Sequence, residues 1–157
     1  VLEAEWSCRT EHNVFANSQE ALILASIIEK ETAWEPDRMR VAAVFVNRLK
    51  KKMKLQTDPT VIYGIDDFDG NLRRKDLRTK TPYNTYIIPG LPPTPICNPG
   101  LSSIKAALQP ITSNNYYFVA RGDGTSEFSE TLAQHNRAVT RFQKSGKIKD
   151  YRSTPSQ

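Results

Sequence analysis

Glu29 is the residue whose type and position point most directly to chemistry. It ends the apolar run Ser26-Ile27-Ile28, one turn beyond Ala25 and Ser26, and falls on the same predicted helix face as Leu22. Burial of that face would raise the pKa of the carboxyl group, and a position near the helix C-terminus would raise it further. A raised pKa is what a general acid needs near neutral pH. The alternative is a structural carboxylate that bonds a backbone group or a basic residue.

Glu31 is a second carboxylate on the same predicted helix. It lies about 200° around the helix from Glu29, so the two side chains cannot share one face. Only one of them can point into a given cleft. We therefore expect Glu31 to brace a neighbouring segment or to form an ion pair at the surface.

Two polar segments are candidates for a functional site, and the second of them has the composition of a sugar-binding segment. The first is Gln56-Thr57-Asp58, beside a predicted short helix that Asp58 can also cap. The second is Tyr83-Asn84-Thr85-Tyr86. Aromatic rings stack on pyranose faces, and amides between them bond hydroxyl groups, although tyrosines also serve as ordinary packing residues.

The remaining reactive side chains do not form a recognisable metal or cofactor site. His135 lies on an apolar stripe, which is typical of a buried histidine with satisfied hydrogen bonds. Together with His12, Cys8 and Cys97 it lacks the spacing of a zinc site. A glycine-rich phosphate loop and a nucleophile elbow are also missing from the sequence. We expect no metal and no cofactor, and the two cysteines can form one bridge or remain free thiols.

The elements that must position these residues are mostly helical. Helix caps and apolar spacing predict helices over 19–32, from Glu35 to about 49, over 60–63, 102–109 and 130–144. In the first helix Ser18 is the predicted N-cap. A β-hairpin is predicted over 116–120 and 127–129. The expected class is therefore α+β, mostly helical with a small β-hairpin.

The chain of 157 residues is long enough for one domain. We expect residues 1–18 to be a lead-in from a missing N-terminal domain, 19–145 to be the main domain, and 146–157 to be a flexible tail. Residues 66–82 are a predicted charged loop. Five of the ten prolines fall in 89–99, which predicts a stiff, extended loop.

The net charge of +5 and a pI near 9.3 indicate an anionic partner. Basic residues gather in 48–54 and 73–80, which can be a solvated helix end and a charged loop or the rim of a groove for an acidic polymer. Nucleic acid is one such polymer, but no nucleic-acid-binding motif accompanies the charge, and we expect no nucleic-acid partner. No apolar run approaches the roughly 18 residues of a membrane span.

The order of the motifs resembles the endolytic murein transglycosylase family, also called YceG-like. The matching segments, in family order, are 24–32, 44–49, 55–64, 83–86, 90–93, 95–100, 116–120, 128–129 and 135–136. Two departures are visible. Thr94 stands between prolines where the family usually has glycine, and Thr125-Ser126-Glu127 stands where a histidine is common.

The resemblance implies that Glu29 is the catalytic acid and base. The expected reaction is non-hydrolytic cleavage of the MurNAc–GlcNAc β-1,4 bond within peptidoglycan strands, which leaves 1,6-anhydroMurNAc ends. The expected substrate contacts are Gln56, Asp58, Tyr83, Asn84 and Thr85, and the expected supporting residues are Glu31, Asn98 and His135. The loop 89–99 is expected to wall the cleft.

The resemblance also implies a cellular setting. The family is anchored in the bacterial inner membrane through an N-terminal helix that this chain does not contain, and its catalytic part faces the periplasm or cell wall. Its role is in cell-wall synthesis and remodelling, where peptidoglycan synthases are possible partners. Two alternatives remain at this point, a lysozyme-type hydrolase that uses water and a glycan-binding module without catalysis.

Overall fold

The computed structural model describes residues 1–11 and 13–144. The helices are α1 (Leu2–Ser7), α2 (Ser18–Glu31), α3 (Glu35–Lys50), α4 (Asp58–Tyr63), α5 (Arg74–Arg78), α6 (Leu101–Leu108) and α7 (Leu132–Val139), and the strands are β1 (Tyr117–Ala120) and β2 (Ser126–Ser129). The predicted α+β class, mostly helical with one small hairpin, is confirmed. The tail expected over 146–157 lies outside the described residues.

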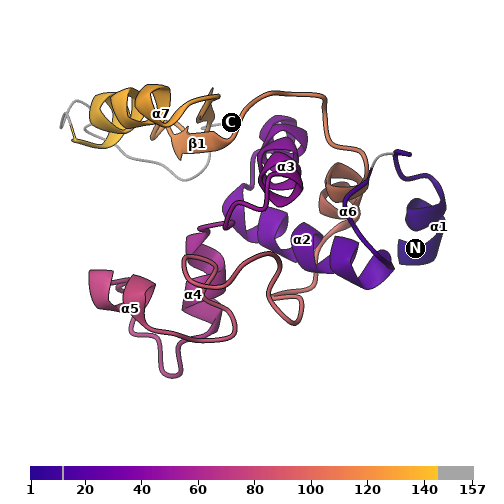
Figure 1. Ribbon diagram of the computed structural model, residues 1–157, viewed down its shortest axis with the longest axis horizontal. Coiled ribbons are helices and arrows are strands. Elements are labelled where there is room, and N and C mark those ends of the chain that lie inside the picture. The colour runs from indigo at the N-terminus through magenta and orange to yellow at the C-terminus, as the bar shows by residue number, and fades with distance from the viewer. Residues whose placement is uncertain (12, 145–157) are drawn as a thin grey trace.

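Helix α2 forms the centre of the core. Its residues Leu24, Ala25, Ile27 and Ile28 are fully buried, as expected of a helix that is apolar on most sides. Helices α3 and α6 pack against it (Figure 1). The N-cap is Asn17, whose side chain accepts a hydrogen bond from Glu20 N, so the predicted cap at Ser18 is wrong by one residue.

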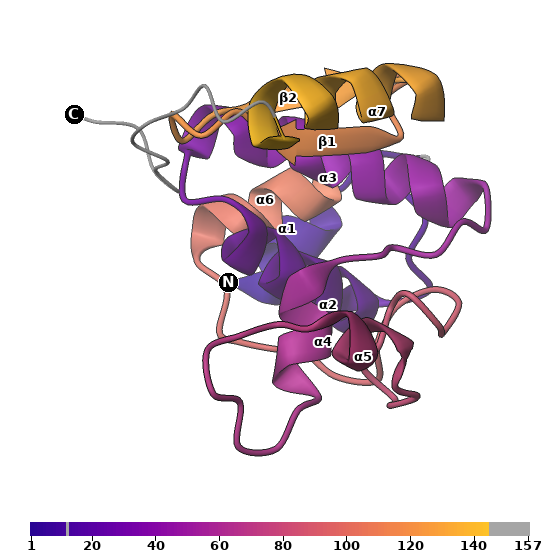
Figure 2. The same ribbon diagram turned by 90° about the vertical axis from the view of Figure 1, so that its left-hand side faces the viewer.

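The hairpin and α7 form a separate tier that lies over α3 (Figures 1 and 2). The Asn47 side chain of α3 donates to the carbonyls of Ser113 and Asn115, just before the hairpin. The buried carboxylate of Asp37 accepts from Ser126 N at 2.9 Å, and Phe45 meets Phe118 edge to face. The hairpin is therefore fixed to α3 by polar contacts at its edges and an aromatic contact between them.

The segment predicted as a lead-in contains α1, whose Leu2 and Trp6 pack against the core. The domain expected before it stays a prediction. Two other local expectations need correction. The predicted loop 66–82 contains α5. The last helix ends at Val139 and continues as a π-helical turn, Thr140–Lys144. Within the described residues, no helix combines the length and the apolar character that crossing a bilayer requires.

The proline-rich loop 89–99 runs along α2. Ile96 N donates to the Ser26 hydroxyl at 3.0 Å, and the Cys97 thiol donates to the Ser26 carbonyl. Cys97 and Cys8 are free thiols. The loop leads into Gly100, the N-cap of α6, and its hydrogen bonds attach it to Ser26 in the middle of α2.

Candidate active site

A cleft of about 580 Å³ lies between the α2–α4 region and the tier formed by the hairpin and α7. Glu31, Gln56 and Asp58 line one side of it. Tyr117 and His135 line the opposite side, together with other residues of the hairpin and α7. Among the described residues that line the cleft, none comes from 89–99, so the expectation that this loop walls the cleft is wrong.

Glu31 is one of the carboxyl groups that line the cleft, and Asp58 is another. Glu31 is half-buried at the last residue of α2, and the Thr57 hydroxyl donates a hydrogen bond to its Oε1. Burial raises the pKa of Glu31 from 4.5 to about 7, and the nearby negative charge of Asp58 raises it as well, against the opposite effect of the Thr57 bond. A carboxyl with this pKa is substantially protonated at neutral pH and can donate its proton.

Asp58 and Tyr86 form a second polar pair in the cleft. The Tyr86 hydroxyl donates to Asp58 Oδ1 at 2.6 Å. Burial and the Asp58 carboxylate raise the pKa of Tyr86, so the phenol keeps its proton. The charge of Asp58 is therefore held in place by a neutral donor, and it remains available to disfavour ionisation of Glu31.

A group of buried threonines holds Thr57 against Glu31. Thr57 N donates to Thr85 Oγ1 at 3.0 Å, and the Thr60 and Thr85 hydroxyls lie 2.8 Å apart. Thr57, Thr60 and Thr85 are all buried. Since each hydroxyl has a partner, the group is rigid and aims the Thr57 hydroxyl at the carboxyl of Glu31.

Glu29 faces away from the cleft, towards α6. Its Oε2 accepts from the Ser103 hydroxyl at 2.6 Å and from Gly100 N at 3.0 Å, and its Oε1 lies 3.8 Å from Arg38. The bond from Ser103, with help from Gly100 and Arg38, lowers the pKa of Glu29 despite partial burial. The predicted rise in this pKa is therefore wrong, because the carboxylate bonds the N-terminal residues of α6, where an anion is stabilised.

Replacing Glu29 with alanine is expected to lower the stability of the fold. The change leaves the buried Ser103 hydroxyl and the Gly100 N–H without their acceptor, which costs roughly 1–3 kcal/mol. Glu29→Gln keeps an acceptor oxygen and is expected to cost less. Urea denaturation of both variants checks this order, and equal stability of Glu29→Ala and the wild type would contradict the role of Glu29 in joining α2 to α6.

Three of the predicted substrate contacts lie elsewhere. Asn84 is fully buried and its amide donates to the carbonyls of residues 76, 77 and 79 at the end of α5. Thr85 belongs to the buried threonine group. Tyr83 packs edge to face on Tyr63, and its hydroxyl lies 2.8 Å from that of Thr94. These residues do not line the cleft, and their polar groups bond other parts of the chain instead.

Of the predicted supporting residues, His135 lines the cleft and Asn98 is exposed outside it. The His135 ring stacks on Tyr117, with centroids 5.1 Å apart. Burial and the charge of Arg48 lower the pKa of His135, so the ring is neutral at neutral pH. Its Nδ1 is buried and finds no hydrogen-bond partner among the described residues, which differs from the satisfied histidine that the sequence predicts.

Sequence reasoning missed Arg48 as a site residue, and it named Tyr86 within a candidate segment without including it among the expected substrate contacts. Arg48 is a buried cation that donates to the carbonyls of Tyr116 and Lys54, and it lies over the Tyr117 ring. Arg48 belongs to the basic run 48–54, and a basic residue in such a run is usually expected to be a solvated surface charge. Tyr86 could have been included, since it closes the same tetrapeptide as Tyr83.

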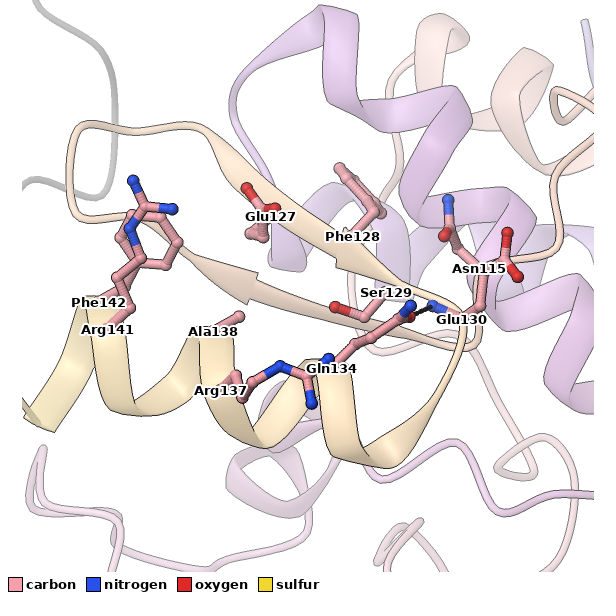
Figure 3. Close-up of a pocket in the computed structure, with 10 residues that line it drawn as sticks. All are labelled: Asn115, Glu127, Phe128, Ser129, Glu130, Gln134, Arg137, Ala138, Arg141 and Phe142. Atoms are coloured by element: carbon pink, nitrogen blue, oxygen red, sulfur yellow. Dashed lines mark hydrogen bonds between the residues drawn. The ribbon is translucent and has the colours of Figure 1, made fainter.

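A second cavity, of about 470 Å³, lies on another face of α7 (Figure 3). Gln134 and Ala138 line it from α7, Phe142 lines it from the π-helical turn, and Ser129 lines it from the hairpin. Its Glu127 carboxylate forms an ion pair with Arg121. This cavity contains neither Glu29 nor Glu31, so it is separate from the candidate site. Over the described part of the chain, no three His, Cys, Asp or Glu side chains gather as a metal site would require.

Comparison with known proteins identifies the class of this fold and site. A family model described as the YceG-like family matches residues 2–141. An endolytic murein transglycosylase of Bacillus subtilis is 47% identical over 121 residues, which is 77% of this chain and 34% of that protein. One of Streptococcus pneumoniae is 34% identical over 126 residues, covering 76% of this chain and 23% of that protein.

A solved structure agrees with these sequence relatives. The crystal structure of a YceG-like protein from Listeria monocytogenes matches with a TM-score of 0.70 and 48% identity, over 76% of this chain and 38% of that one. The chain therefore belongs to the YceG-like family. It spans about a third or less of the length of the curated relatives that it matches.

Proposed function

We propose that this chain carries the catalytic site of an endolytic murein transglycosylase, with Glu31 as its acid and base. The observation that carries the proposal is the half-buried Glu31 carboxyl in the cleft, whose pKa is raised to about 7. The names of the relatives support the substrate class, the glycan strands of peptidoglycan. The pKa of Glu29 is lowered instead of raised, so its carboxyl group is ionised, and it bonds α6.

In the first step, protonated Glu31 donates its proton to the oxygen of the MurNAc–GlcNAc bond as that bond breaks. The Thr57 hydroxyl keeps the carboxyl in one orientation, and its bond favours the carboxylate that proton donation leaves behind. An oxocarbenium-like centre develops at C1 of MurNAc. The anions of Glu31 and Asp58 lie in the same cleft and stabilise that positive charge.

In the second step, the Glu31 carboxylate takes the proton from the C6 hydroxyl of the same MurNAc. The C6 oxygen attacks C1, a new C–O bond closes the 1,6-anhydro ring, and Glu31 is again protonated. No water is consumed, so one carboxyl group is sufficient. Because the nucleophile belongs to the substrate, holding C6–OH near C1 supplies an intramolecular advantage.

Mass spectrometry of the fragments released from purified peptidoglycan tests this proposal. We expect products that end in 1,6-anhydroMurNAc, each one water lighter than the reducing form, and we expect Glu31→Gln to reduce their release by about 10²–10⁴-fold. Reducing ends would instead indicate a hydrolase, in which a water attacks C1. Binding of strands without release would indicate a glycan-binding module, and either result would overturn the proposed reaction.

The substrate class also bears on where the site acts. Peptidoglycan lies outside the cytoplasmic membrane, and we infer that this part of the protein works on the cell-wall side. A membrane anchor elsewhere in the protein and peptidoglycan synthases as partners are consistent with that setting. Fractionation of cells with an antibody to this domain tests the location.

A further inference from the structure

We propose that Gln56 is a specificity-determining residue, whose side-chain amide donates a hydrogen bond to the acetamido carbonyl at C2 of the sugar beside Glu31. The inference rests on the proposed function and deepens it by naming the group of the substrate that is recognised. Gln56 is exposed and lines the cleft, and it immediately precedes Thr57, whose hydroxyl bonds Glu31. Gln56 therefore lines the same cleft as Glu31, the group that protonates the glycosidic oxygen.

The backbone of Gln56 is held in a conformation that its residue type disfavours. Its φ is +51°, in the left-handed region that glycine adopts freely and other L-residues rarely adopt. The bond from Gln56 N to Thr85 O, at 3.2 Å, and the bond from Thr57 N to Thr85 Oγ1 fix this turn on the buried threonine group. A residue other than glycine at such a position suggests that its side chain is needed there.

Arg48 determines which end of the Gln56 amide faces the cleft. Its Nη1 donates to Gln56 Oε1 at 3.5 Å, and Arg48 itself is fixed by the carbonyls of Tyr116 and Lys54. A guanidinium group has donors only, so it attracts the amide oxygen and repels the amide NH₂. The amide therefore turns Oε1 towards Arg48 and presents its two N–H donors to the cleft.

A donor in this position selects an acceptor on the sugar. Each sugar of a murein strand carries an acetamido group at C2, one carbon from the C1 atom where the bond breaks. Its carbonyl accepts hydrogen bonds and has no proton to donate, whereas the ammonium of an N-deacetylated sugar is a donor that would oppose the Gln56 N–H groups. The geometry thus predicts that the cleft prefers N-acetylated strands.

Binding of N-acetylated and N-deacetylated murein strands in the Glu31→Gln background tests the inference, because that background removes turnover from the measurement. We expect about tenfold tighter binding of acetylated strands when Gln56 is present, the effect of one well-formed hydrogen bond. Gln56→Gly removes the side chain but suits the backbone, so the preference should disappear while the melting temperature stays equal or rises. Gln56→Glu should reverse the preference towards the ammonium form.

Gln134→Glu is the matched control, since it makes the same amide-to-carboxylate change on the face of α7 that borders the second cavity. Glutamate also preserves the capping contacts that Gln134 makes at the start of α7. We expect it to keep the preference of the Glu31→Gln background. A preference that survives in Gln56→Gly, or no difference between the two strand types with Gln56 present, would overturn the inference. A failure of the proposed function would instead appear as absent cleavage by the protein with Glu31 intact.

Discussion

Glu31→Gln is expected to reduce release of glycan fragments by about 10²–10⁴-fold, because positioned proton transfer typically contributes that much. Glutamine matches the shape of the protonated carboxyl, and its oxygen can still accept from Thr57. The cleft should therefore keep its structure and lose only the transferable proton. Steady-state turnover of purified peptidoglycan strands, followed by separation of the products, measures the loss.

Glu29→Gln is the control for that experiment, since the same chemical change is made two residues away on the opposite side of α2. Its activity is expected to stay within a few-fold of the wild type at a temperature where both proteins are folded. The reverse pattern, with cleavage lost in Glu29→Gln and kept in Glu31→Gln, would transfer the acid role to Glu29. It would also mean that the bonds from Ser103 and Gly100 break when substrate binds.

The second large expected effect is the pH dependence of the free energy of unfolding that Glu31 causes. Below the ordinary pKa of 4.5, Glu31 is protonated in both the folded and the unfolded chain, and its burial costs little. As the pH rises from 4.5 through about 7, the unfolded chain releases the proton first, so this part of the stability is progressively lost. Above pH 7 the shift corresponds to up to about 3 kcal/mol of destabilisation.

Glu31→Gln removes that titration, so the variant is expected to be more stable than the wild type at pH 8 and similar to it at pH 5. Urea denaturation of both proteins at the two pH values measures the difference in their free energy of unfolding. The contributions of the other ionisable groups largely cancel in that difference. Glu29→Gln should be less stable than the wild type at both pH values, because the pKa of Glu29 is lowered below 4.5 and the stabilisation by its ionised form is lost only as the pH falls below that range. A difference between wild type and Glu31→Gln that does not change with pH would contradict a raised pKa for Glu31.

Much of the fold follows from local sequence features. The apolar centre of α2, the proline in the first turn of α3 and of α4, and the turn residues of the hairpin predict elements that the structure contains. The errors are local in origin. Ser18 and Asn17 are residue types that cap helices equally well, so the sequence does not decide between them. Helix α5 has five residues, with most of its side chains charged and none buried, and so lacks any apolar period.

The sequence predicts part of the candidate site. The errors in the predicted substrate contacts share one cause. The sequence places Gln56 and Asp58 in a polar segment that does line the cleft. It cannot distinguish them from Asn84 and Thr85, which are equally polar but bond their own chain in the interior. Whether a polar side chain meets substrate or backbone depends on the packing of segments that are distant in sequence.

Glu29 and Glu31 of α2 show most clearly which properties the sequence determines and which the tertiary structure determines. Sequence alone establishes that Glu29 and Glu31 lie on different faces of one helix, because the helical period requires it. It does not establish the rotation of that helix, which is set by how α2 packs between α3 and α6. That packing brings Gly100 and Ser103 to Glu29 and lowers its pKa, and it leaves Glu31 beside Thr57 and Asp58 with a raised one. The identity of the acid is therefore a property of the packed protein, since a pKa depends on neighbours that only the tertiary structure supplies.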